Sequence, residues 1–256
     1  MPIPYQRLFL AYTIAMQRFL LWAAAAVAFA QQPNTLDNYY APGDDARVGQ
    51  RLAKQLQTNV TTATEPRLDQ IGNRLAAHRP QFLYRFFVFD GGQPSQDTAP
   101  AAAFPADWRR LQINEAIAVA GGMIFVPRAL PSRDDAQLAA ILAHAMGHIA
   151  LRHPTMGMTR GELAQVEVQV ASRAMVDEAP QRLHAVALER FAFDRACEMA
   201  ADGYAIKLLQ DAGFDPAALL AYLRTLPAPE GEDLSVYPAP AERTEAAQKA
   251  IVGLGR

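Results

Sequence analysis

The stretch "LAAILAHAMGHIALRHP", Leu138–Pro154, determines how the rest of this chain is interpreted. His144 and His148 are four residues apart in an otherwise apolar run, so a helix places them on one face with their Cβ atoms about 5–6 Å apart. Two imidazoles in this arrangement can share one tetrahedral zinc ion through bonds of about 2.0–2.1 Å. The spacing is that of the H-E-x-x-H motif of zinc proteases, but Ala145 occupies the position of the glutamate.

The residues around these histidines predict a helix that is buried in a core. Its large apolar side chains are Leu138, Ile141, Leu142, Ile149 and Leu151. Gly147 is a poor helix former and costs about 1 kcal/mol relative to alanine, so we expect another part of the chain to pack tightly against the backbone there. His153, in "LRHP" after the helix, is predicted to be a surface or capping residue rather than a ligand.

A catalytic zinc site needs a third protein ligand and an open position for water. The segment "FDRACEMAADGYAIKLLQDAGFDP" supplies a candidate, because Glu198 and Asp202 are again four residues apart in an alanine-rich helical pattern. Acidic side chains are rarely buried unless they are paired or bound to a metal. On the histidine spacing alone, chance placement of two hydrogen-bonded histidines is the more common explanation, and the acidic pair alone could belong to a solvated face with Arg195.

Taken together, the motifs resemble the HtpX- and CAAX-prenyl-protease-like zinc metallopeptidases, a gluzincin-type family, in their small, secreted bacterial form. The resemblance runs from about Val48 to Arg243 and rests on the order of "GGMIFVPRAL", "LAHAMGHIALRH", "CEMAADGYA" and "AGFDP" along the chain. It implies an α+β fold: a mostly helical, zincin-like domain with a small, largely antiparallel sheet beside the active-site helix.

The resemblance also implies roles for particular residues. His144, His148 and Glu198 match the metal ligands, which would bind one Zn²⁺ ion. Asp202 matches the aspartate that orients a ligand imidazole without touching the metal. The segment "AVAGGMIFV" resembles the strand along which an extended peptide substrate lies, by β-strand addition.

This chain departs from the family pattern at several positions. Ala145 replaces the glutamate that removes a proton from the zinc-bound water. Tyr237 stands where members often have the histidine of a His-Pro pair, and Glu115 and Ala120 replace an asparagine and a proline near the glycine pair. On family analogy alone, Arg243 and Tyr237 are candidates for stabilising an oxyanion.

The substitution at Ala145 decides the expected activity. An alanine methyl accepts no proton, and the loss of base catalysis usually costs a factor of about 10²–10⁴ in rate. Zinc alone still lowers the pKa of its bound water to about 7. A deliberate Glu-to-Ala change would explain Ala145, but the drift at Tyr237, Glu115 and Ala120 and the retained export signal favour a natural sequence.

Three functions therefore remain in competition. The first is a zinc metalloendopeptidase-type protein that acts on periplasmic or other exported proteins, with little or no activity as written. The second is a non-catalytic, zinc-binding pseudo-peptidase that binds extended or unfolded polypeptide. The third, a purely structural helical protein, would bind no zinc. In the first two the partner is a polypeptide substrate or client.

Composition and the N-terminal sequence predict one exported domain. The chain has 256 residues, of which 51% are hydrophobic, and a formal net charge of -2 without a basic stripe, which gives no reason to expect nucleic acid. Arg7 and Arg18 precede the apolar run "FLLWAAAAVAFA", which ends in a small-x-small pattern. These features describe a signal peptide over residues 1–30, with a possible start at Met16.

The remainder, residues 31–256, is expected to form a single metallopeptidase-like domain in the periplasm or another extracytoplasmic space. If the N-terminal segment stays uncleaved, it would anchor the protein in a membrane. Sequence periodicity predicts two helices after Asp44 that separate near "TTATEP", and a strand over Phe82–Asp90. "EAIAVA" and "GMIFVP" predict two strands joined by a tight turn. The composition of Gly91–Trp108 predicts a loop, and the sequence does not decide whether this loop covers the active site.

Overall fold

A computed structural model describes most of the predicted domain. It covers residues 38–59, 62–79, 82–89, 115–161, 179–227 and 238–254, with the side chains of 55–62 and 179–191 left out. The chain divides into two units, Met1–Asn34 and Thr35–Arg256, and all of these residues belong to the second unit. The predicted signal peptide with Met16, the loop over Gly91–Trp108 and Tyr237 lie outside the described residues.

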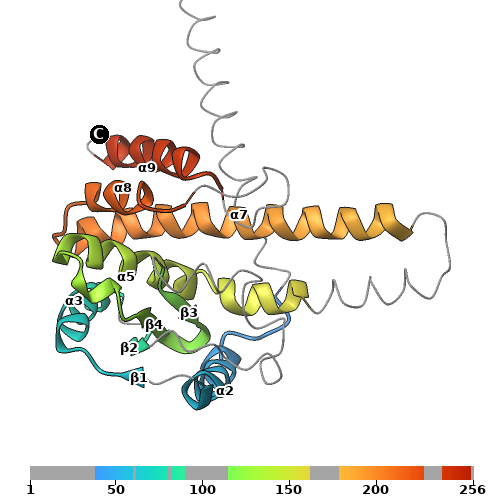
Figure 1. Cartoon of the computed structure of the whole chain (residues 1–256), viewed down its shortest axis with the longest axis horizontal. Coiled ribbons are helices and arrows are strands. Elements are labelled where there is room, and N and C mark those ends of the chain that lie inside the picture. Colours follow the sequence, from blue (N-terminus) through green and yellow to red (C-terminus); the bar gives the residue numbers. More distant parts are fainter. Residues whose placement is uncertain are drawn as a thin grey trace, which may run out of the picture. The chain divides into compact units, whose positions relative to one another are not determined.

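Helices make up most of the described residues (Figure 1). They are α2 (Asp44–Asn59), α3 (Pro66–Ala76), α5 (Asp135–Ala150), α7 (Ala179–Asp211), α8 (Ala217–Leu223) and α9 (Pro240–Leu254). A further helical segment, over residues 153–161, follows α5. The strands are β1 (Thr62–Ala63), β2 (Arg85–Phe89), β3 (Ile117–Val119) and β4 (Met123–Pro127). This architecture confirms the predicted mostly helical α+β fold.

The strands form one small sheet in the order β1-β2-β4-β3. The central pair, β2 and β4, is parallel, and the two outer pairs are antiparallel. The predicted tight pair is β3 and β4, in which Ile117 is opposite Phe125. Gly121 and Gly122 join these strands with φ angles of 74° and 94°, a region that favours glycine.

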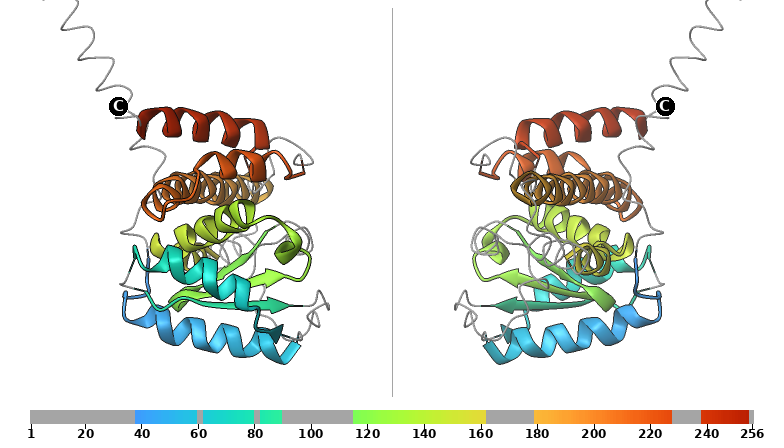
Figure 2. Two further views of the ribbon diagram at one scale, coloured as in Figure 1. Left: turned by 90° about the vertical axis from the view of Figure 1, so that its left-hand side faces the viewer. Right: turned by 90° about the vertical axis from the view of Figure 1, so that its right-hand side faces the viewer.

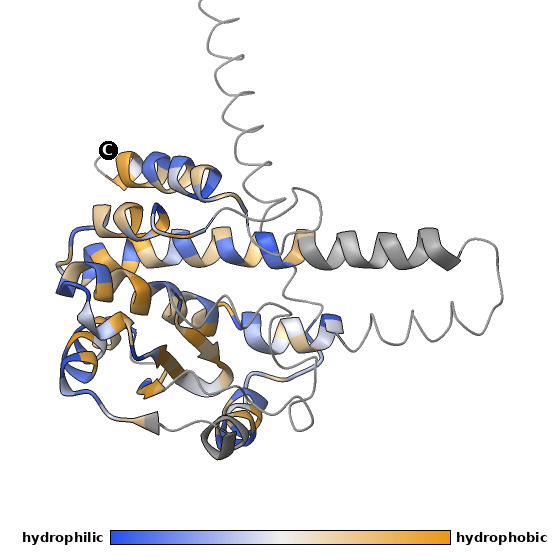
Figure 3. Cartoon of the chain, viewed as in Figure 1, coloured by the Kyte–Doolittle hydropathy of each residue, from blue (hydrophilic) through white to orange (hydrophobic). Residues whose placement is uncertain are grey.

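The sheet separates two apolar cores, because both of its faces are covered (Figure 2). Alternate residues of β4 belong to different cores: Ile124 packs with α3, α5 and α8, whereas Phe125 packs under α2. Every residue of β4 is therefore buried. Figure 3 shows hydrophobic residues over the strands and much of α5. None of the helices in the described ranges combines the length and hydrophobicity that a bilayer crossing needs.

The crossing of α5 over α7 explains the glycine in the histidine motif. A Cβ atom at Gly147 would lie 2.9 Å from the carbonyl oxygen of Ala201 and 3.2 Å from its Cα atom. The predicted close packing at Gly147 is therefore confirmed. Ala201 follows Glu198 by one turn of α7, so this contact brings the acidic pair of α7 next to the histidines of α5.

Candidate metal centre

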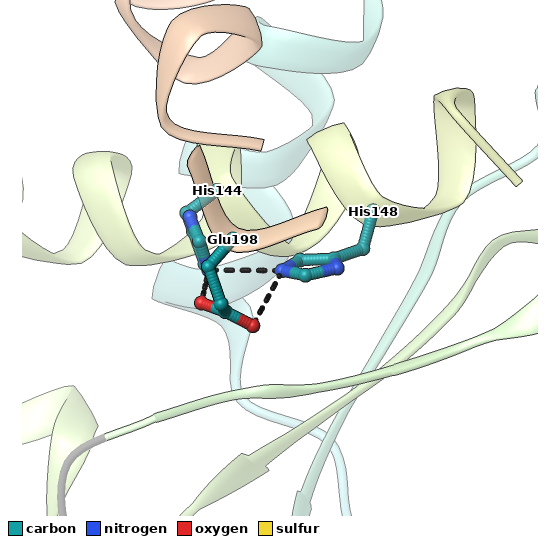
Figure 4. A group of neighbouring side chains, drawn as sticks. All are labelled: His144, His148 and Glu198. Atoms are coloured by element: carbon teal, nitrogen blue, oxygen red, sulfur yellow. Dashed lines mark hydrogen bonds and ion pairs between the residues drawn. The ribbon is translucent and has the colours of Figure 1, made fainter. Parts of the chain in front are cut away.

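Two helices bring the three predicted ligands together. His144 and His148 project from α5 and Glu198 from α7, and Figure 4 shows their side chains pointing toward one another. The two Nε2 atoms are 3.1 Å apart. The Glu198 carboxylate reaches both rings, with Oε2 3.3 Å from His144 Nε2 and Oε1 3.4 Å from His148 Nε2. Among the described residues, these three form the group of side chains that could hold a metal ion.

These separations fit a tetrahedral zinc ion. Bonds of about 2.0–2.1 Å in a tetrahedron separate neighbouring ligand atoms by ~3.3–3.4 Å, and the observed distances run from 3.1 to 3.4 Å. Glu198 Oε2 is buried and forms ion pairs with His144 Nε2 and Arg243 Nη1, but it accepts no well-aligned hydrogen bond among the described residues. Two imidazole nitrogens and a carboxylate that face one another are also the kind of donor set that zinc takes in proteins.

The three candidate ligands differ in their electrostatic surroundings. Burial alone would lower the pKa of His144, but the carboxylates of Asp202 and Glu198 raise it to about 9. Burial lowers the pKa of His148 to about 4, against the attraction of Glu198. Burial opposes ionisation of Glu198, yet His148 and Arg243 hold the pKa of that carboxyl below its usual range. A metal ion bound by these side chains would have to displace a proton from His144.

Asp202 and Arg243 form a charged layer behind the ligands. Asp202 Oδ1 is 2.9 Å from His144 Nδ1, on the side of the ring away from Glu198. Arg243, from α9, donates from Nε and Nη2 to the two oxygens of Asp202 at 2.8 and 2.9 Å. Its Nη1 lies 3.1 Å from Glu198 Oε2, so all three guanidinium nitrogens face carboxylates. Arg243 is only 1% exposed, and these ion pairs compensate the cost of burying its charge.

The predicted surface position of His153 was wrong. This residue is 6% exposed, and its Nδ1 atom lies 3.1 Å from Nδ1 of His148. The chain turns sharply after α5 because Arg152 has a φ of 61°, and the turn directs the next side chain back toward the helix. Helical periodicity gives no signal for this contact, because the two histidines are five residues apart and separated by the end of α5.

The residue at the position of the missing base offers no proton acceptor. Ala145 is 1% exposed and packs into the apolar core beside α5. A different carboxylate, Glu115, lies just before β3 and was noted from the sequence only as a departure from the family pattern. Burial and then the charge of Glu198 raise the pKa of Glu115 to about 7, and the charges of Arg243 and His144 also act on it. The structure therefore adds an acidic group to the neighbourhood of the ligands.

Comparison with known proteins places this geometry in a family. A model of Peptidase family M48 matches residues 62–251, which is most of the chain. The chain belongs to Peptidase family M48. This result confirms the resemblance to metallopeptidases drawn from the motif order.

Two curated relatives of this M48 chain have named activities. The Beta-barrel assembly-enhancing protease of Escherichia coli (strain K12) is 25% identical over 227 residues, covering 78% of this chain and 42% of that protein. The mitochondrial metalloendopeptidase OMA1 of Arabidopsis thaliana is 30% identical over 115 residues, covering 43% of this chain and 24% of that protein. The chain thus spans less than half the length of these relatives.

Proposed function

We propose that this M48 chain is a zinc metalloendopeptidase-type protein of an exported compartment, with little or no turnover as written. The observation that carries the proposal is the convergence of His144, His148 and Glu198, with the two Nε2 atoms 3.1 Å apart and one carboxylate oxygen within 3.4 Å of each, close to the spacing of zinc ligands. These three side chains would hold one Zn²⁺ ion. When bound, the ion would polarise a peptide carbonyl and lower the pKa of its bound water.

The other residues of the site would position the ligands rather than react. Asp202 would hold His144 through Nδ1, and Arg243 would hold Asp202 and Glu198 in place. Metal affinity commonly falls about 10–100-fold when such outer partners are lost. We therefore assign Arg243 a positioning role, because its nitrogens already face these carboxylates.

The substrate or client would be an extended polypeptide. β3 is at the edge of the sheet and packs beside α5, so a peptide added to this edge would lie next to the histidines. The relatives named as a protease and a metalloendopeptidase support a polypeptide partner. The apolar run that precedes Gln31 supports export, and the segment would place the protein at a membrane only if it is not cleaved.

A second function is favoured by the buried methyl group of Ala145. Without a proton acceptor at this position, the protein would retain the metal and the peptide-binding edge but would hydrolyse little. The chain would then act as a zinc-binding pseudo-peptidase that binds extended or unfolded polypeptide. One restored side chain distinguishes this function from the first.

The test is casein cleavage by Ala145→Glu with and without a chelator. If the protein is a silenced protease, A145E raises the cleavage rate by about 10²–10⁴ and the chelator removes the gain. A145Q is the matched control, because it has nearly the same volume as A145E but no basic oxygen. No gain in a zinc-loaded A145E would favour the pseudo-peptidase. A wild-type protein that binds no zinc would refute both.

A further inference from the structure

The two ligand imidazoles have different partners behind them. His144 presents its Nδ1 atom to the carboxylate of Asp202, at 2.9 Å. His148 presents its Nδ1 atom to a third imidazole, that of His153, at 3.1 Å between the two Nδ1 atoms. The rings of His148 and His153 meet edge to face, with centroids 5.0 Å apart and planes at 78°. This second contact joins two imidazoles, whereas the first joins an imidazole and a carboxylate.

One proton decides the function of this contact. Two ring nitrogens at hydrogen-bond distance need one N–H donor and one lone-pair acceptor. If Nδ1 of His148 donates, its Nε2 lone pair faces Glu198 and can bind a metal. If Nδ1 of His153 donates, the proton of a neutral His148 is on Nε2 and points at the other ligands, which prevents metal binding. The direction of this hydrogen bond therefore sets the tautomer of a ligand.

We infer that His153 is a positioning residue that accepts the proton of His148 Nδ1 and so keeps this ligand in its metal-binding tautomer. The inference rests on the proposed metal site. In this arrangement the proton of His153 is on Nε2, an atom that is buried and has no hydrogen-bond partner in the part of the chain described. His153 does not act as a further ligand, because its near nitrogen faces Nδ1 of His148 rather than the cluster of Nε2 and Oε atoms.

The turn that places His153 is held from another part of the chain. Arg152 adopts a left-handed conformation, which costs a non-glycine residue about 1–3 kcal/mol and persists only when its surroundings fix it. Its guanidinium donates to Asp45 at 2.7 Å (Nε to Oδ2) and 2.9 Å (Nη2 to Oδ1), and to the backbone oxygen of Tyr40 at 2.6 Å. Asp45, in the first turn of α2, thereby fixes the backbone of Arg152, which directs His153 toward α5.

The test combines substitutions of His153 with a spectroscopic readout. An asparagine places an amide oxygen close to the former Nδ1, whereas a glutamine amide reaches the former Nε2 position. We expect His153→Leu and H153Q to weaken zinc binding by about 10–100-fold, measured by competition with a chromophoric chelator. H153N should retain most of the affinity. H78L is the matched control, because His78 is exposed and follows α3, which carries none of the site residues.

Side-chain ¹⁵N correlation spectra of the wild-type protein give an independent result. They should show His148 as the Nδ1–H tautomer in both the metal-free and the zinc-loaded protein. An Nε2–H tautomer of His148 in the metal-free protein, or zinc affinity in H153L equal to that of wild type, would overturn the inference. A wild-type protein that binds no zinc would instead overturn the proposed function, while the metal-free spectrum would still test the hydrogen bond.

Discussion

The candidate metal ligands and the neighbouring Ala145, at the position of the missing base, differ in how much of the fold depends on them. The candidate ligands His144, His148 and Glu198 face one another at 3.1–3.4 Å, and Asp202 and Arg243 compensate the charges behind them. Every one of these groups lies in or against the crossing of α5, α7 and α9. A change to any one of them would disturb a packed, charged layer.

At position 145, the methyl group of an alanine stands in place of the expected base, and the fold accommodates it. Ala145 fills a small space in the apolar core, and its absence of charge needs no compensation. In the proposed function, metal binding and proton transfer are thus separable demands on the structure. The first depends on several helices at once, and the second depends on a single side chain.

The largest expected effect comes from removing Arg243, the buried cation behind the candidate ligands. Arg243→Met removes the buried guanidinium that pairs with Asp202 and Glu198, and breaking such a buried pair usually costs about 3–5 kcal/mol of unfolding free energy. Urea denaturation of the metal-free protein should show this loss. K249M is the control, because Lys249 pairs with Glu245 on the surface and should change stability by less than about 1 kcal/mol. Equal stability of R243M and wild type would contradict the role given to Arg243.

A smaller effect comes from separating the two ligand helices. Gly147→Ala forces a methyl group against the backbone of Ala201, and such overpacking costs about 1–3 kcal/mol. Zinc affinity should fall with stability, because the contact sets the distance between α5 and α7. G203A lies in α7 with open space around it, so it should be neutral or slightly stabilising. If both variants behave alike, the close contact does not position the ligands.

The pH dependence of zinc binding tests whether His144 carries a proton that the metal must displace. Because carboxylates raise the pKa of His144 to about 9, zinc must displace a proton at neutral pH. Affinity should therefore rise by up to about tenfold per pH unit from pH 6 to 8, which is ~1.4 kcal/mol per unit. Competition titrations at fixed ionic strength measure this slope. A flat profile across that range would show that the site carries no such proton.

The smallest expected effect concerns Glu115. Its folded pKa of about 7 lies above the ordinary value of 4.5, so its stabilising contribution is fully present below pH 4.5 and is lost as pH rises through 7. In the metal-free protein, Glu115→Gln should raise the melting temperature by a few degrees at pH 8, at about 2–4 °C per kcal/mol. The gain should shrink near pH 5, where wild-type Glu115 is protonated. A gain that is larger at pH 5 would reverse the assigned shift.

Local patterns in the sequence predict much of this molecule. The four-residue spacings identify the helical faces of α5 and α7, and Gly147 predicts their close approach. Gly121 and Gly122 predict the tight connection that pairs β3 with β4. These features depend on residues close together in the chain, where periodicity and turn chemistry apply directly.

Other features escape the sequence because they depend on distant contacts. The parallel pairing of β2 and β4 joins strands separated by a long connection, and no local pattern specifies it. His153 approaches His148 only because Asp45 holds the turn at Arg152. The charge on Glu115 matters only once the fold places it near the ligands. Such contacts become predictable only when the packing of the helices is known.

The most direct test of the account is calorimetric titration of the metal-stripped wild-type chain and Glu198→Ala with zinc. The account predicts one tightly bound equivalent for wild type and a large loss of affinity for E198A, because one corner of the tetrahedron is gone. E245A removes an exposed glutamate on α9, and this variant should bind zinc as wild type does. Equal zinc affinity in E198A and wild type, or no binding by wild type, would contradict the claim that α5 and α7 together hold a metal ion.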